Sequence, residues 1–295
     1  MPNRNISLII GAFAIIYIVW GSTYLINYFA IETIPPFLMS GSRFVVAGTL
    51  MYFIGRLLRY SKPTPTQWRN AALSGILLLA VGTGGVVWAE QYVDTGAAAL
   101  IVASDPLIVL LLVWLIRKQP PTWNSLLGIA LSIPSVALLI GQDLFLSDQS
   151  TLLGIVVIFI SIVSWAFATV FIGGADLPRS FVQLAAIQML AGGFFLLTAS
   201  LLSCEYQHFS LAMVSMKSAL SWLYLIFLGS ILAFSAFNFL LLRVSPEKVA
   251  TSAYVNPVIA VWLGWLFNEE TLTTQSVIAA ALIIIGVFFI NNRFR

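Results

Sequence analysis

Residues 6–27 read ISLIIGAFAIIYIVWGSTYLIN, an apolar run without a single charged side chain. A helix needs about 20 such residues to cross the hydrocarbon core of a bilayer, and a backbone in lipid must satisfy its own hydrogen bonds. Nine more runs of similar length follow it, at 36–56, 70–91, 96–117, 122–141, 152–172, 180–203, 220–242, 247–267 and 273–291. The sequence therefore predicts an all-α integral membrane protein with ten transmembrane helices.

The composition excludes several other classes of protein. Charged residues make up 8% of the chain and apolar residues 60%, whereas a soluble domain has roughly 25% and 45–50%. We therefore exclude a soluble enzyme, and we expect no nucleic-acid partner because the basic residues form no cluster. The single cysteine, Cys204, and the single histidine, His208, favour neither an internal disulfide nor a metal site or other cofactor.

The basic residues indicate how the chain is oriented in the membrane. One side of the predicted membrane carries Arg4, Arg56, Arg59, Lys62, Arg69, Arg117, Lys118, Arg179, Arg243, Lys248, Arg293 and Arg295. The other side carries Lys217 and the acidic residues Glu32, Asp94, Asp143, Asp148, Glu205, Glu269 and Glu270. Lys and Arg accumulate in cytoplasmic loops, so we expect both termini to be cytoplasmic. Arg4 before the first run imitates a secretion signal, but the run is too long for one, so we expect a retained helix.

The two halves of the chain resemble each other at fixed offsets. Trp20 with Trp165 and Arg43 with Gln188 are 145 residues apart, and Pro106 with Pro257 and Trp114 with Trp265 are 151 apart. Apolar helices resemble one another by composition alone, but matching Trp and Pro positions at a constant offset are harder to obtain by chance. We expect two five-helix repeats, 1–147 and 148–295. Because five is odd, the second repeat enters the membrane inverted, as in many secondary transporters.

Short motifs in both halves resemble those of a known family. They are Trp20-Gly21-Ser22-Thr23-Tyr24, Pro36 and Arg43-Phe44 near the start, Asp105-Pro106 with Trp114, and Asn256-Pro257 with Trp265 to Glu270. This pattern resembles the EamA branch of the drug/metabolite transporter superfamily over nearly the whole chain. It departs from the family where Arg117-Lys118 replaces an acidic residue. The resemblance implies an inner-membrane carrier, commonly an exporter of amino acids or other metabolites, with a central cavity between its halves.

Two predicted helices carry a polar residue followed by proline near their middles. Asp105 and Asn256 each lie about 14 Å along their predicted span at 1.5 Å per residue. Asp or Asn before Pro is typical of a helix restart, with the side chain capping free amides. Paired breaks of this kind indicate a transport site at the midplane, with Pro106 and Pro257 as gating candidates. The alternative is a proline kink that only shapes helix packing.

Arg43 is the one basic residue deep inside a predicted span, about 10 Å from its outer end. Such a residue costs roughly 2.5–3.5 kcal/mol on insertion scales, so it needs a partner. Asp105, at similar depth, and Glu90 are the candidates. In one interpretation Arg43 binds an anionic substrate group in exchange for Asp105; in the other it forms a permanent structural ion pair.

Aromatic and polar residues on shared helix faces complete the candidate site. Trp20, Tyr24 and Asn27 follow a helical spacing, and Trp165 and Thr169 repeat it in the second half. Such a wall suits a small amphipathic ligand. The further candidates are Trp88, Gln188, Asn238 and Tyr254. For any one of these residues, aromatic or polar packing between helices is the alternative.

We therefore expect a secondary carrier that works by alternating access around a midplane cavity. Its partners would be a small-molecule substrate, the lipid bilayer and protons taken up by Glu90 or Asp105, and one chain suffices to enclose the cavity. The alternatives are a facilitative pore or a membrane sensor without a transport cycle. An intramembrane enzyme is disfavoured, because no predicted span contains His, the only Lys in a predicted span is Lys248 at the cytoplasmic end of 247–267, and no Gly-x-Ser-x-Gly motif occurs.

Overall fold

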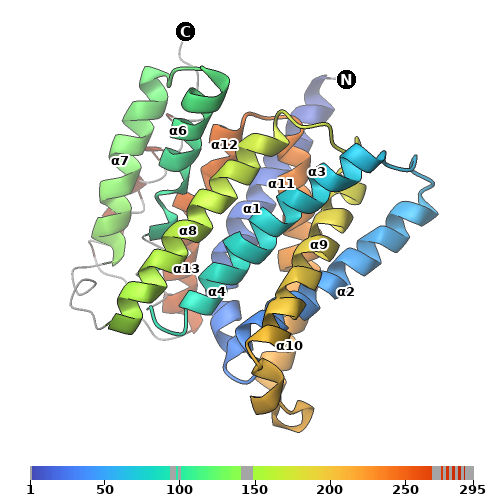
Figure 1. The fold of residues 1–295 in the computed structure, drawn as a ribbon. Helices are drawn as coiled ribbons and strands as arrows, with labels where there is room; N and C mark the ends of the chain where they lie inside the picture. Colours follow the sequence, from blue (N-terminus) through green and yellow to red (C-terminus); the bar gives the residue numbers. More distant parts are fainter. Residues whose placement is uncertain are drawn as a thin grey trace.

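The structure, a computed structural model, describes residues 2–93, 98, 101–140 and 149–267, and the separate positions 274, 277, 278, 281, 282, 285, 286 and 289. Every regular element among these residues is a helix, and the long helices lie side by side in one bundle (Figure 1). Several residues named above lie outside the described part: Asp94, Asp143, Asp148, Glu269, Glu270, Arg293 and Arg295.

The helices of the first half are as follows. They are α1 Pro2–Ile31, α2 Pro36–Leu57, α3 Pro65–Gly75 with its continuations η1 Ile76–Thr83 and α4 Gly84–Ala89, α6 Asp105–Arg117 and α7 Trp123–Ile140. The helices of the second half are α8 Gln149–Ile172, α9 Phe181–Leu202, η3 Glu205–His208, η4 Leu211–Met213, α10 Met216–Tyr224 with η5 Leu225–Phe234 and α11 Ser235–Leu241, α12 Pro246–Ala250 and α13 Ser252–Phe267.

Six of the described helices are long and apolar enough to cross a membrane. They are Ile6–Ile31, Pro36–Leu57, Pro65–Ala89, Gln149–Ile172, Phe181–Leu202 and Met216–Leu241, and their ends lie within a few residues of the predicted spans. Three more predicted spans contain the helices α6, α7 and α13, and 273–291 lies mostly outside the described residues. The protein is therefore a multi-pass membrane protein, and ten helices with both termini cytoplasmic stay predictions.

Corresponding helices of the two halves pack in corresponding ways. Helix α1 packs against α13 and η5, and α8 packs against α6 and η1. The segments η1 and η5 are both π-helical and lie in the third and eighth predicted spans. The sequence analysis did not predict these π-helical segments. Their matching positions support an internal repeat in three dimensions as well as in sequence.

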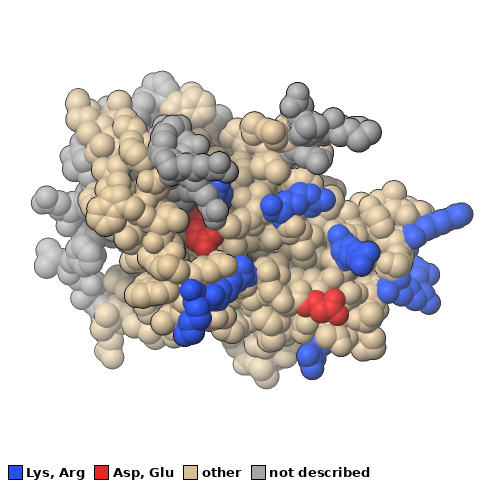
Figure 2. Space-filling model, turned by 90° about the horizontal axis from the view of Figure 1, so that it is seen from above, with Lys and Arg blue, Asp and Glu red and all other residues tan. Residues whose placement is uncertain are grey.

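Basic side chains gather at the end of the bundle where α1 begins. Figure 2 looks onto this end and shows many Lys and Arg side chains with few acidic ones. Two hydrogen bonds join the α2–α3 and α8–α9 regions here. Gln67 Nε2 of α3 donates to Asp176 Oδ1 in the α8–α9 connection at 3.0 Å, and Gln183 Nε2 of α9 donates to the Ser61 carbonyl in the α2–α3 connection at 2.9 Å. This arrangement agrees with the charge asymmetry from which the cytoplasmic orientation is predicted.

Glycines allow α2, α3 and α9 to approach one another closely. A Cβ atom on Gly48 would lie 2.9 Å from the Leu190 amide nitrogen, and one on Gly41 would lie 2.9 Å from that of Leu197. A Cβ atom on Gly75 would overlap the backbone of Gln188, which cannot move aside as a flexible side chain can. The tight contact between these three helices therefore depends on the absence of side chains at these positions.

We expect Gly75→Ala to lower the stability of the folded protein by about 3 kcal/mol, since overpacking against backbone forces the helices apart. Thermal unfolding in detergent measures this effect. Gly11→Ala is the matched control, because no atom lies within 4 Å of a Cβ atom at Gly11 and alanine favours a helix. Equal unfolding midpoints for the two variants would contradict the packing described at Gly75.

At the opposite end of the bundle, Glu205 caps the start of α2. Its carboxylate accepts hydrogen bonds from the backbone amides of Phe37 at 3.1 Å and Leu38 at 2.8 Å. These are free amides in the first turn of α2, where the helix dipole favours a negative charge. The loop after α9 is therefore fastened to the first half of the chain.

We expect Glu205→Gln to destabilise the protein by roughly 1 kcal/mol, because the amide has one acceptor and no charge. Glu32→Gln is the control, since the Glu32 carboxylate forms an exposed salt bridge of 2.8 Å with Lys217 and exposed pairs contribute little. Both variants are compared by thermal unfolding in detergent. A larger loss for Glu32→Gln than for Glu205→Gln would be inconsistent with capping.

Candidate functional site

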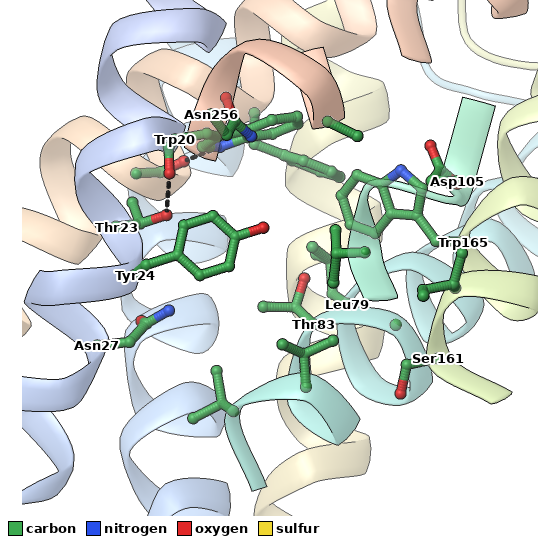
Figure 3. Close-up of a pocket in the computed structure, with 18 of the residues that line it drawn as sticks. Trp20, Thr23, Tyr24, Asn27, Leu79, Thr83, Asp105, Ser161, Trp165 and Asn256 are labelled. Carbon is green, nitrogen blue, oxygen red and sulfur yellow. Dashed lines mark hydrogen bonds between the residues drawn. The ribbon is translucent and has the colours of Figure 1, made fainter. Parts of the chain in front are cut away.

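A cavity of about 160 Å³ lies inside the bundle, between helices of both halves (Figure 3). Its aromatic lining comes from Trp20, Tyr24, Phe44, Trp165 and Phe234, and its charged and amide side chains are those of Asn27, Arg43, Glu90, Asp105 and Asn256. Tyr24 on α1 and Trp165 on α8 point into it from opposite sides (Figure 3). The cavity combines a mostly apolar wall with a few polar groups, which is typical of small-molecule sites.

The two repeat-related tryptophans contact each other at this cavity. The rings of Trp20 and Trp165 are edge to face, with centroids 5.7 Å apart. Trp20 also donates from Nε1 to the Gly229 carbonyl in η5 at 3.3 Å. Each half of the chain therefore contributes one of the two tryptophans to the same part of the cavity.

Arg43 does not form the predicted ion pair. Its Nη1 donates to Asn27 Oδ1 at 2.9 Å, and its guanidinium carbon lies 4.4 Å from the centre of the Phe44 ring. Within the described part of the chain, the one salt bridge is Lys217 with Glu32. Of the two interpretations, the permanent ion pair is therefore wrong, because the neutral Asn27 amide lies within bonding distance and neither candidate carboxyl, Asp105 or Glu90, lies within 4 Å. Glu90 interacts with Arg43 electrostatically over this longer range.

Several polar atoms around the cavity are buried and have no hydrogen-bond partner among the described residues. They are both carboxylate oxygens of Glu90, Asp105 Oδ1, Asn256 Oδ1 and Arg43 Nε. Each buried unsatisfied group costs about 1–3 kcal/mol. Buried polar groups without a partner require an explanation, and their position around a cavity indicates a binding site.

The two helix breaks are found near the predicted places, but they are built differently. Asp105 is the first residue of α6, its carboxylate caps no amide, and Ser104 is the N-cap. Asn256 and Pro257 lie inside α13, which begins at Ser252. The prediction that Asn256 starts a new helix segment is therefore wrong.

The helix in this span breaks at Thr251, where α12 ends, and this explains why no new helix starts at Asn256. Thr251 Oγ1 donates to the Lys248 carbonyl at 2.6 Å and lies 2.8 Å from the Tyr17 hydroxyl of α1. These hydrogen bonds hold a turn there, and the helix that follows accommodates Pro257 in its interior. The break in this span thus precedes the proline by about one and a half helical turns.

Not all the predicted site residues reach the cavity. Trp20, Tyr24, Asn27, Arg43, Glu90, Asp105, Trp165 and Asn256 line it. The others lie elsewhere: Thr169, Gln188, Asn238 and Tyr254 are buried in the bundle, Trp88 lines a second hollow near Glu32 and Glu205, and Pro106 and Pro257 do not line the cavity. Gln188 Nε2 donates to Ser74 Oγ at 2.9 Å and Asn238 Nδ2 donates to the Phe234 carbonyl at 3.2 Å, while the oxygen atoms of both amides are buried without a partner among the described residues.

The sequence analysis also missed lining residues. These are small or apolar residues such as Thr23, Gly82, Thr83, Ser161, Gly229 and Ser252. Thr23 lies one helical turn after Trp20, a spacing that places both on one face of α1. The others carried no signal in the sequence, since small residues occur throughout membrane helices.

Comparison with known proteins identifies the family. The model of the EamA-like transporter family matches the chain twice, at residues 7–141 and 152–292. The chain belongs to the EamA-like transporter family. The two matches confirm the resemblance seen in the sequence and cover nearly all of both halves.

Relatives in this family are similar over their whole length. The uncharacterized inner membrane transporter YedA of Escherichia coli K12 is 36% identical over 99% of this chain and 93% of its own. The uncharacterized transporter YoaV of Bacillus subtilis is 22% identical over 92% of each chain. A protein of known crystal structure shares the fold, with a TM-score of 0.77 over 95% of both chains at 16% identity. EamA relatives are thus named as transporters, and these names state no substrate.

Proposed function

We propose that this EamA-family protein is a secondary active transporter that exports amino acids or related small amphipathic metabolites. The observation that carries the proposal is the cavity between the two halves, where aromatic rings surround buried polar atoms that lack protein partners. Such a lining supplies both apolar contact and hydrogen bonds to a small amphipathic solute. By analogy with YedA, which is named as an inner membrane transporter, the protein acts in the inner membrane.

Alternating access is the mechanism that we propose. Both repeats contribute to the lining of the cavity, and each has a helix break beside it, at 103–104 and at Thr251. In transporters with inverted repeats, one half rocks against the other around a fixed central site. The contact between Trp20 and Trp165 lies between the halves, so such rocking would change it directly.

Ion gradients supply the energy in this proposal. A phosphate-binding loop needs a lysine directly after a glycine, and none of Lys62, Lys118, Lys217 and Lys248 follows one. Asp105 and Glu90 line the cavity and are 5% and 9% exposed, so either carboxyl can exchange a proton when the cavity opens to one side. Proton coupling through one of them is part of the proposal.

Uptake into sealed proteoliposomes tests the proposal. The liposomes are offered a mixed pool of amino acids and other metabolites, with and without a pH gradient, and their contents are read by mass spectrometry. We expect saturable accumulation of one chemical class. Non-saturable entry would indicate a pore, and no entry of any compound into liposomes with folded protein would favour a sensor.

A further inference from the structure

The charged side chains that line the cavity are unequally divided between acidic and basic. Among their fully buried atoms and those of Asn256, the unpartnered acceptors are the two Glu90 oxygens, Asp105 Oδ1 and Asn256 Oδ1, and the unpartnered donor is Arg43 Nε, within the described residues. Among the charged side chains in the lining, two are acidic and one is basic. The charges of the lining therefore favour a ligand that brings a positively charged donor group.

The basic side chain is already engaged on one side of the cavity. Arg43 bonds Asn27, stacks on Phe44 and interacts electrostatically with Glu90. The guanidinium group thus already has a hydrogen bond, a ring contact and an acidic neighbour at longer range. A substrate carboxylate at Arg43 would compete with these contacts and would add a negative charge to a lining that already has two acidic side chains and one basic one.

Asp105 is the acidic side chain left without a basic neighbour in the described part of the chain. It is 5% exposed, it lines the cavity, and no salt bridge involves it there. Asp105 interacts electrostatically with the hydroxyls of Tyr24 and Tyr254, which carry no positive charge. A buried carboxylate needs a cation or hydrogen-bond donors to compensate the loss of water.

Aromatic rings surround the space beside Asp105. Tyr24 and Trp165 project into the cavity, and Trp20 contacts Trp165 (Figure 3). The faces of such rings attract cations, most strongly for tryptophan. The cavity therefore offers a carboxylate and aromatic faces to the same bound group.

We propose that the cavity recognises its substrate by a protonated amine, which binds Asp105 among the rings of Tyr24, Trp20 and Trp165, and that a substrate carboxylate is dispensable. An ammonium group has three donors and no acceptor, which matches the unpartnered oxygens. This inference rests on the proposed function, in which the cavity is the transport site, and it narrows the substrate class from amphipathic metabolites to amines.

Binding to the purified protein in detergent tests the inference without transport. The probes are 3-methylbutylamine and 2-phenylethylamine, each compared with the alcohol, the carboxylic acid and the amino acid of the same skeleton. Isothermal titration calorimetry and tryptophan fluorescence give the affinities. We expect each amine to bind at least as tightly as its amino acid, and about tenfold or more tighter than its alcohol and its acid.

Asp105→Asn should weaken amine binding by roughly tenfold to a hundredfold, because it removes one charged hydrogen bond. The binding of the alcohols should stay unchanged. Asp176→Asn is the matched control, because Asp176 lies in the α8–α9 connection, outside the cavity, and should keep full affinity. Thermal unfolding confirms that both variants fold. If Asp105→Asn fails to fold, the test depends on the unchanged protein, and the affinities of the amines relative to the alcohols, acids and amino acids decide whether the inference holds.

Acids that bind as tightly as the amines, equal or absent binding of all probes, or full amine affinity in folded Asp105→Asn would each overturn the inference. Its failure is distinguishable from that of the proposed function. Saturable transport of acids or neutral compounds into liposomes would keep the carrier and reject amine recognition. If the unchanged protein binds amines, Asp105→Asn does not, and no compound is transported, the amine site is supported and the proposed carrier function is contradicted.

Discussion

Asp105→Asn is expected to abolish the part of transport that a pH gradient drives. The amide has nearly the shape of the carboxyl and cannot exchange a proton, so the cavity keeps its form and loses its coupling group. We expect the gradient-driven initial rate to fall by about tenfold or more. The measurement is the initial rate in proteoliposomes with and without a pH gradient, for the substrate found in the mixed pool.

Asp176→Asn provides the control for this prediction, because it makes the same chemical change at a connecting loop. It should leave both rates unchanged. If Asp105→Asn folds and keeps the full ratio of the two rates, Asp105 carries no coupling proton. Glu90, the other acidic group of the cavity, would then be the remaining candidate, and Glu90→Gln would be tested in the same way.

Gly229→Leu is expected to block transport without unfolding the protein. Gly229 lines the cavity, and a Cβ atom there would lie 3.5 Å from Thr23 Cγ2 and 3.7 Å from Leu225 Cδ2, which are ordinary contacts. Alanine therefore fits, whereas the longer leucine extends into the space that the substrate needs. We expect Gly229→Ala to transport normally and Gly229→Leu to lose about tenfold or more of the initial rate.

A second control places leucine outside the cavity. Gly174 lies between α8 and α9, with no atom within 4 Å of a Cβ atom, so Gly174→Leu should transport at the unchanged rate. Thermal unfolding separates a blocked cavity from a damaged fold. Full transport by folded Gly229→Leu would show that the substrate does not pass through this cavity.

Local patterns in the sequence predicted the elements and part of the site. Hydropathy predicted the long helices, because the cost of exposing a backbone to lipid leaves helices as the solution for long apolar runs. The helical spacing of Trp20, Tyr24 and Asn27 placed them on one face, and all three line the cavity. This agreement follows because the spacing within one helix fixes which of its residues point together.

The residues that were misplaced depended on how different helices turn toward one another. Depth along a span suggested that Arg43 and Asp105 meet, but depth does not give the direction in which a side chain points. Gln188 shares a repeat position with Arg43, yet it bonds Ser74 in the packed contact of α3 with α9. The offset between the repeats identifies equivalent positions along the backbone, but the side chains at these positions differ between the two halves and make different contacts.

Long-range contacts were also invisible in the sequence. Glu205 was predicted as a charge of the outer loop, and its bonds to the first turn of α2 join segments more than 160 residues apart. Tyr17 similarly bonds Thr251 at the break between α12 and α13. No local signal encodes such pairs, because each residue alone is compatible with a solvated or simply buried position.

Counterflow through reconstituted protein tests alternating access around the cavity most directly. Proteoliposomes are loaded with unlabelled substrate from the mixed-pool experiment, and the entry of labelled substrate is followed without any ion gradient. An alternating-access carrier predicts transient accumulation of label above its equilibrium level, present in Gly229→Ala and lost in Gly229→Leu. Label that only equilibrates, at a rate linear in its concentration, would contradict a carrier and indicate a pore.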